Sequence, residues 1–183
     1  LRLGIMIGDT VLVQRAGDVI PQITGFVSSL RAKSAEIINF PKFCPSCSTL
    51  LAKIDDETIV RCNNIKLCNS QILGRLIHLV SRNALNIEGL GEKQLKELFS
   101  LGIVKNFGDI FRLLSKKSTE IHEQISQLSG WGALSVKNML DSIRISRNQT
   151  LDKLIYSLGI RHVGYGSARL IAKYFTESER FIE

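Results

Sequence analysis

The chain has 183 residues, of which 44% are hydrophobic and 22% are charged. This composition is sufficient for a buried core, so it excludes a fully disordered chain, and the length suggests one or two domains. The longest apolar runs, such as Ile77–Val80, are far shorter than the ~20 residues of a membrane helix, so we expect no membrane association. Leu1–Ile5 contain neither an initiator Met nor a signal peptide, so we expect a segment of a longer protein.

The net charge is +7, from 24 Lys and Arg against 17 Asp and Glu. The excess is spread along the chain and is not gathered in a basic tail. A distributed positive charge suits a polyanion that lies along the whole protein. Charge alone is equally compatible with a basic protein that has no such partner.

Residues 1–27 have the composition of β-strands. Thr10–Arg15 alternates weakly, and strand-like composition resumes in Val19–Val27, where Pro21 is typical of an edge strand or a bulge. Two strands do not form a stable sheet alone, so we expect most of the sheet to lie outside this chain. Residues 28–39 are predicted to be a polar connector.

All four cysteines lie within residues 40–70, spaced as Cys44-x2-Cys47 and Cys62-x5-Cys68. Two separated pairs of thiolates are the ligands of a closed, structural zinc site. About 30 residues are too few to hold a core, so the metal would supply the folding free energy. A redox dithiol, a disulfide and unligated cysteines are the alternatives. Between the pairs, residues 50–60 are predicted to form a β-hairpin with Asp55 and Asp56 at its tip.

From Ser70 onward the pattern is helical. Ile72, Leu76, Leu79 and Val80 share one face of a first helix, for which Ser70 is the predicted N-cap. Asn106 is predicted to open a later helix, and Thr176–Glu179 has the sequence of a capping box.

An internal repeat runs through this helical part. Ile87–Gly91 is echoed by Leu128–Gly132 and, more loosely, by Ile160–Gly164, in which His162 replaces the first glycine. Aligned on the second glycine, the three copies carry apolar residues four and seven positions later: Leu95, Val136 and Ala168, then Leu98, Met139 and Ile171. Five positions later each copy carries a cation: Lys96, Lys137 and Arg169.

This repeat is the pattern of the helix-hairpin-helix. Glycines let the backbone of another molecule approach closely, and the following helix offers unpaired N–H groups with a favourable dipole. With the cation one turn later, each hairpin makes a phosphate site that binds DNA without selecting sequence. The alternative is that each Gly-x-Gly is only a turn in an ordinary helical bundle. Phosphate-loop, zinc-protease and serine-hydrolase motifs are absent, so we expect this segment to bind and not to catalyse.

In this order, the parts resemble the C-terminal half of bacterial NAD-dependent DNA ligases. The resemblance rests on Gly8–Val11 and Arg15–Gln22, on Cys44–Cys47 and Arg61–Gln71, and on His78–Arg82, Ile87–Lys93 and Leu158–Gly164. It implies a mainly α, multi-domain chain: the last strands of an OB fold plus a connector (1–39), a four-Cys zinc module (40–70), and a truncated tandem helix-hairpin-helix domain (71–183). Ser48 departs from the pattern, because the family usually has glycine after the first cysteine pair.

The resemblance also implies a function. The intact enzyme would seal 5′-phosphate/3′-hydroxyl nicks in duplex DNA during replication and repair, with NAD and Mg²⁺ bound outside this chain. The adenylation motif K-x-D-G is absent, so we expect the segment alone to be inactive in self-adenylation. We expect a monomer that binds nicked double-stranded DNA in the bacterial cytoplasm, associated with the nucleoid.

The matching stretches imply DNA contacts by Arg15 through phosphate and by Val19 and Ile20 through apolar groups in the minor groove. The predicted DNA-binding set is completed by residues of the hairpins and their second helices: Gly89, Gly91, Lys93, Lys96, Gly130, Gly132, Lys137, Arg161, His162, Gly164 and Arg169. Two rival hypotheses are a non-enzymatic junction-binding protein built from OB and helix-hairpin-helix parts, and a zinc-ribbon interaction protein that does not bind DNA.

Overall fold

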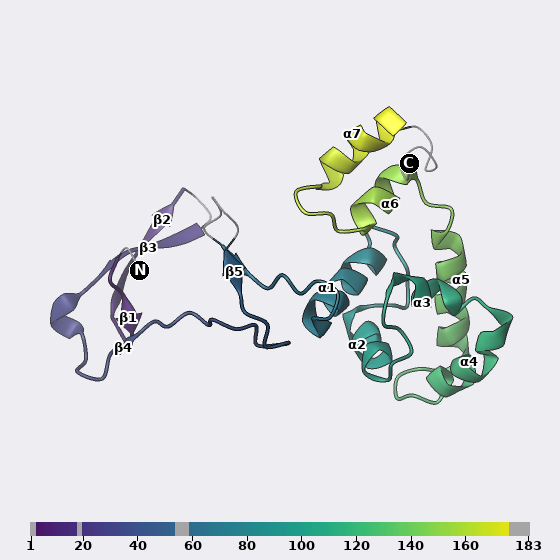
Figure 1. The fold of residues 1–183 in the computed structure, drawn as a ribbon, viewed down its shortest axis with the longest axis horizontal. Helices are drawn as coiled ribbons and strands as arrows, with labels where there is room; N and C mark the ends of the chain where they lie inside the picture. The colour runs from purple at the N-terminus through teal and green to yellow at the C-terminus, as the bar shows by residue number, and fades with distance from the viewer. Residues whose placement is uncertain (1–2, 18–19, 54–58, 176–183) are drawn as a thin grey trace. The chain divides into compact units, whose positions relative to one another are not determined.

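The computed structural model describes residues 3–17, 20–53 and 59–175, and Figure 1 shows its secondary structure. Contacts between Cα atoms divide the chain into two compact units, residues 1–62 and 63–183, each described by itself below. The predicted domain boundaries, after residues 39 and 70, stay predictions. The longest helix of the described residues has 14 residues, and none is long and apolar enough to cross a membrane.

The described residues of the first unit form three small antiparallel sheets of two strands each. β2 (Val11–Ala16) pairs with β3 (Ile20–Phe26), and the register shifts between Leu12 and Val13. The two strands that the sequence predicted at this place are therefore confirmed. Pro21 lies within β3 opposite Arg15, and in the described residues β3 pairs only with β2, so proline occupies an edge strand.

Residues 28–39 are more ordered than the polar connector that the sequence predicted. They contain a 3₁₀ turn, η1 (Ser28–Leu30), and a strand, β4 (Glu36–Ile37), which pairs with β1 (Met6–Ile7). The reason is a contact that spans 22 residues. The Arg31 guanidinium donates to both carboxylate oxygens of Asp9, at 2.7 and 2.6 Å, and so returns the segment to the first strands.

In the third sheet, β5 (Ala52–Lys53) pairs with β6 (Val60–Arg61). These strands are the two sides of the hairpin predicted between the cysteine pairs. Its tip, with Asp55 and Asp56, lies outside the described residues, as do Val19 and the predicted capping box Thr176–Glu179.

The second unit is helical. Its helices are α1 (Asn69–Val80), α2 (Glu92–Ser100), α3 (Phe107–Arg112), α4 (Thr119–Ser126), α5 (Ala133–Ser146), α6 (Leu151–Ser157) and α7 (Tyr165–Phe175), with a 3₁₀ turn, η2 (Lys116–Ser118), before α4. Leu76, Leu79 and Val80 of α1 are buried, so the predicted apolar face is confirmed. They join one core with buried residues of α2, α3, α4 and α5.

The start of α1 differs from the prediction. The helix begins at Asn69 with Cys68 as its N-cap, and not after Ser70. The Cys68 carbonyl accepts from the amides of Gln71 and Ile72, both at 3.0 Å, so the helical hydrogen bonds begin at the last cysteine. The predicted start of α3 is confirmed, because Asn106 is its N-cap.

α6 and α7 pack on each other, and α6 also contacts α1. His78 of α1 makes a 2.8 Å hydrogen bond through Nε2 to the Tyr156 carbonyl, and the two rings meet edge to face with centroids 4.8 Å apart. His78 is therefore a packing residue.

Candidate nucleic-acid interface and metal centre

The three repeated segments adopt the same backbone turn, which we call elbows 1, 2 and 3 (residues 87–91, 128–132 and 160–164). In each elbow, the amide of the fourth residue donates to the carbonyl of the first: Leu90 to Ile87 at 3.4 Å, Trp131 to Leu128 at 3.0 Å, and Val163 to Ile160 at 3.0 Å. The third residue has a left-handed backbone each time, with φ of 84° at Gly89, 83° at Gly130 and 64° at His162. The glycine pattern thus predicted a real structural repeat.

A helix follows each elbow directly. The last glycine is the N-cap of α2 and of α5, and α7 begins directly after Gly164. Its carbonyl accepts the first bond of the new helix, from Leu95 at 2.9 Å, Val136 at 3.0 Å and Ala168 at 2.9 Å. The three donating residues are the apolar positions that the repeat aligned, and all three are buried.

The first-turn amides of α2 and α5 receive no side-chain cap within the described part of the chain. Gly91 of elbow 1 and Gly130 of elbow 2 are exposed, and Gly132 is partly exposed. An N-terminus of this kind has unpaired N–H groups and the positive end of the helix dipole. Chemically, it is suited to an anion.

The predicted cations of the repeat are all exposed: Lys93, Lys96, Lys137, Arg161 and Arg169, together with the elbow residue His162. Elbow 1 differs from the other two. Glu92 is the first residue of α2, and its carboxylate accepts a 2.5 Å hydrogen bond from Lys96, which lowers the pKa of Glu92. At the same positions, α5 has Ala133 and an exposed Lys137. Elbow 2 is therefore a more favourable anion site than elbow 1.

Elbows 1 and 2 each contact the helix that follows the other elbow. The Trp131 indole nitrogen of elbow 2 donates to the Glu97 carboxylate of α2 at 2.8 Å, and the Glu88 amide of elbow 1 donates to Ser142 Oγ of α5 at 2.7 Å. A Cβ on Gly89 would be 3.3 Å from the Met139 Cβ, so only glycine permits this approach without movement. These links join residues far apart in the chain, and no motif in the sequence predicted them.

A hollow of about 360 Å³ lies between these two elbows, with Gly89 and Gly130 in its lining. Its other lining residues are polar or amphipathic: Glu88, Gln94, Trp131, Ser135 and Asn138. Trp131 itself packs against the hydrophobic core, as its apolar position in the repeat predicted.

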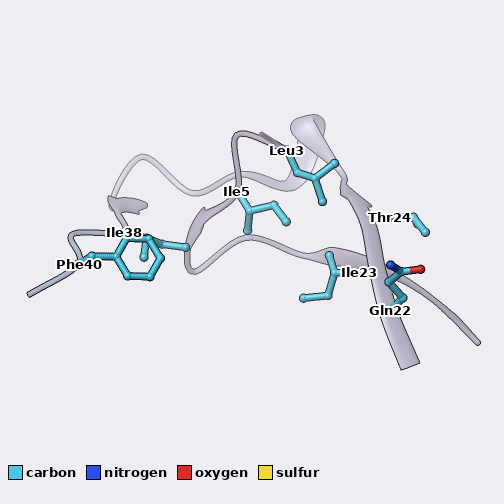
Figure 2. Close-up of a pocket in the computed structure, with 7 residues that line it drawn as sticks. All are labelled: Leu3, Ile5, Gln22, Ile23, Thr24, Ile38 and Phe40. Atoms are coloured by element: carbon cyan, nitrogen blue, oxygen red, sulfur yellow. The ribbon is translucent and has the colours of Figure 1, made fainter. Parts of the chain in front are cut away.

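The predicted contacts of the first unit lie on β2 and β3. Arg15 is exposed, and Ile20 is 70% exposed; Val19 is outside the described residues. Beside these strands lies a mainly apolar hollow of about 610 Å³. Its lining residues are labelled in Figure 2: Leu3, Ile5, Ile23, Ile38 and Phe40, with Gln22 and Thr24. In the described part of the first unit, Cys44 is the only buried hydrophobic residue. The strands therefore carry an apolar face without a core of their own.

The four cysteine sulfur atoms all lie within 4.8 Å of one another, and those of Cys47 and Cys62 are 3.6 Å apart. Sulfur ligands about 2.3 Å from a central tetrahedral ion would be roughly 3.8 Å apart. The residues present therefore fit a metal ion, and four thiolates leave no open coordination position. Cys44, Cys47, Cys62 and Cys68 are the residues that would hold it.

Local hydrogen bonds prepare this cluster for a cation. The side-chain hydroxyl of Thr49, 3.3 Å from the Cys47 sulfur, and the Thr49 backbone lower the pKa of Cys47 to about 6. Ser48 adopts φ of 55°, in the left-handed region, and donates its amide to the Cys44 carbonyl at 2.8 Å. The glycine expected at this position of the zinc module would adopt that conformation without strain.

Three bacterial proteins that are similar to this chain are each named DNA ligase. The similarity extends over the whole chain in two of them, which confirms the resemblance to DNA ligases drawn from its motifs. The chain is 43% identical over 182 residues to the DNA ligase of Rickettsia canadensis (strain McKiel) and 41% identical over 182 residues to that of Cellvibrio japonicus (strain Ueda107), covering 100% of this chain and 26% of each relative.

The DNA ligase of Listeria monocytogenes serotype 4b (strain F2365) is 44% identical over 171 residues, which are 93% of this chain and 24% of that protein. The chain thus spans about a quarter of the length of the curated relatives that it matches. No family model matches it.

Proposed function

We propose that this chain is the DNA-gripping part of an NAD-dependent DNA ligase, and that it holds nicked duplex DNA without regard to sequence. The observation that carries this proposal is the repeated elbow, which ends at an exposed helix start without a side-chain cap in α2 and α5. The relatedness to DNA ligases supports the identity of the anion as DNA. The elbows would then be those of tandem helix-hairpin-helix motifs.

Each elbow would bind one backbone phosphate. Amides at the start of the helix donate to the phosphate oxygens, and the cation one turn later, Lys137 in α5 or Arg169 in α7, adds a charged donor. These donors read only the sugar–phosphate backbone, so binding would be independent of base sequence. Because elbow 1 contacts α5 and elbow 2 contacts α2, their two phosphate sites would have a fixed spacing.

For the whole protein we propose the sealing of 5′-phosphate/3′-hydroxyl nicks during replication and repair in the bacterial cytoplasm. NAD would supply the adenylate group and Mg²⁺ would assist the phosphoryl chemistry, both at sites outside this chain. The apolar hollow of the first unit supports a sheet that is completed by other parts of the ligase, an OB fold in this proposal. Arg15, Val19 and Ile20 would then lie along the minor groove.

We further propose that the four cysteines hold one structural zinc ion. The expected result of metal analysis is one zinc per chain, lost on Cys44→Ser together with order in residues 43–72, as read by amide exchange. A metal-free chain whose amide exchange is unchanged by Cys44→Ser would contradict the proposal.

The elbows are tested by the salt dependence of binding to a nicked duplex. Replacing Lys96, Lys137 and Arg169 together by Ala is expected to lower the slope of log K against log salt by up to roughly 2.7, about 0.9 for each phosphate contact. A matched control, with Lys33, Lys117 and Arg147 replaced by Ala, makes the same change in net charge away from the elbows. Equal slopes for the two triple variants would contradict the proposal.

A further inference from the structure

A second basic surface lies on the helical unit, and the elbows do not include it. A hollow of about 330 Å³ has three cations in its lining, Lys66, Arg75 and Lys105, around apolar walls from Ile65, Ile72 and Phe107. A neighbouring hollow of about 420 Å³ shares Lys66, Ile72 and Lys105 with it and continues along the end of α2. The two hollows form one groove, which we call the basic groove.

The three cations of the basic groove differ in one respect from three other cations of the helical unit. Lys96, Arg112 and Arg144 are each ion-paired with a carboxylate one turn away on their own helix. No described carboxylate makes an ion pair with a cation of the basic groove, and none of the residues that line either hollow is acidic. Positive charge is therefore in excess within the lining of the groove, and Asp109, which accepts from the amides of Lys105 and Asn106, is a carboxylate beside it.

The groove also has fixed walls. The Arg75 guanidinium lies over the Phe107 ring, 5.2 Å from its centroid, and a cation–π contact of this kind restrains a long side chain. Leu67 and Leu101 extend the apolar wall into the second hollow, where they are 76% and 46% exposed. An extended groove with cations and apolar walls suits a linear ligand that alternates phosphates with less polar groups.

We propose that the basic groove binds a backbone segment of nucleic acid, with phosphates at Lys66, Arg75 and Lys105 and sugars against the apolar walls. This inference rests on the proposed function, because it adds a further contact to the same DNA. The groove is separate from elbow 1: that elbow precedes α2, whereas the groove lies at the other end of this nine-residue helix, about 14 Å away. DNA held by the elbows would thus be contacted over a longer stretch.

The test is a comparison of three variants of the zinc-loaded chain on a nicked duplex of about 30 base pairs. In the first variant Lys66, Arg75 and Lys105 are replaced by Gln, which keeps part of each stem. We expect the slope of log K against log salt to fall by up to roughly 2.7. The second variant, Lys66→Arg with Arg75→Lys and Lys105→Arg, keeps the charges and is expected to bind as the parent does. The third is the elbow variant described above.

The outcomes separate the two proposals. If the slope falls for the elbow variant but not for the Gln variant, the basic groove proposal fails while the function stands. If neither slope falls, both the basic groove proposal and the proposed function fail. Titration with AMP and with a poly-glutamate peptide tests for other ligands. If the parent binds either one, and the Gln variant loses that binding but still binds DNA as the parent does, the basic groove is not a nucleic-acid site. Amide exchange of α1 and α3 checks that the Gln variant is folded.

Discussion

Helices α3 and α5 begin in opposite ways. At α3, the Asn106 side chain accepts from the Asp109 amide at 3.1 Å, and Asp109 accepts in return from the amides of Asn106 and Lys105. At α5, Gly132 is the N-cap and makes no side-chain cap, although a Cβ there would meet nothing within 4 Å. A capping residue would fit at Gly132, and the sequence has none.

The difference between the two helices concerns which backbone amides remain without a partner from a side chain. At an N-cap, a capping side chain is worth on the order of a few tenths of a kcal/mol more than glycine, so its omission at Gly132, where space permits one, costs little stability. The same omission leaves amides available to a ligand. In α3 the protein satisfies its own donors, whereas in α2 and α5 it presents them.

Giving α5 a side-chain cap like that of α3 should produce the largest change, a loss of affinity for nicked duplex DNA. Gly132→Asp places a carboxylate over the first-turn amides, and the extended backbone there, with φ of −161°, accepts any residue. We expect the affinity for nicked duplex DNA to fall on the order of a hundredfold, because charged hydrogen bonds are lost and a negative charge is added. Binding titrations measure it.

Two controls accompany that variant. Gly132→Ala adds only a Cβ and is expected to change affinity little, while Gly132→Asn caps the helix without charge and should give an intermediate loss. Gly132→Asp binding as tightly as Gly132→Ala would show that the α5 start does not contact phosphate.

The next largest effect should be a difference in stability between Gly→Ala variants of elbow 1 and elbow 2. Gly89→Ala and Gly130→Ala introduce the same side chain at nearly equal φ, but only the first meets a neighbour, Met139. We expect Gly130→Ala to lower the free energy of unfolding by about 1 kcal/mol and Gly89→Ala by about 2–3 kcal/mol, since overpacking adds to the backbone strain. Urea denaturation measures both; equal losses would argue against the close contact of elbow 1 with α5.

The cap of α3 should respond to pH, whereas the start of α5 should not. Burial raises the pKa of Asp109, but hydrogen bonds from the Lys105 and Asn106 amides and from Arg112 outweigh it, so the pKa lies below 3.8. Asp109 therefore stabilises the fold fully above its unfolded pKa and loses this effect as pH falls through the lower folded value.

We expect Asp109→Asn to cost about 1 kcal/mol at pH 7 and progressively less below about pH 4. The free energy of unfolding of both proteins, measured from pH 7 to pH 2, gives the difference. A cost that does not change with pH would contradict the role of the carboxylate in this cap.

The smallest effect concerns elbow 3, where a histidine has the backbone of glycine. His162→Gly should raise the free energy of unfolding by roughly 0.5–1 kcal/mol by relieving the left-handed strain at φ of 64°. His162→Ala is the matched control, because it removes the same ring contacts but keeps the Cβ. Similar stabilities for the two variants would assign the effect to the ring and not to the backbone.

Much of this fold was predictable because local chemistry determines it. Glycine spacing predicted three turns that share one backbone, with His162 adopting the left-handed conformation of the glycines it replaces. Cysteine spacing predicted the sulfur cluster, and the apolar positions of α1 predicted its buried face.

The remaining features depend on residues far apart in the sequence. The ion pair of Asp9 and Arg31 connects the predicted connector, which contains strand β4, to the first strands. The Trp131 indole nitrogen donates to Glu97, which is 34 residues away in the sequence. The pattern within one segment cannot predict either contact, because the partner residue lies in another segment. The predicted start of α1 was wrong for a local reason: Ser70 is a favourable N-cap residue, but the helical hydrogen bonds already begin at Cys68, two residues earlier.

The links between elbows 1 and 2 have a kinetic consequence. Two binding points joined by a rigid connection act as one bivalent ligand, in which the second contact forms at a high effective concentration once the first has formed. Complete release then requires both points to open within the same short interval. Trp131, Glu97 and Met139 would therefore set the residence time on a strand, although the proposed phosphate contacts are made by other groups.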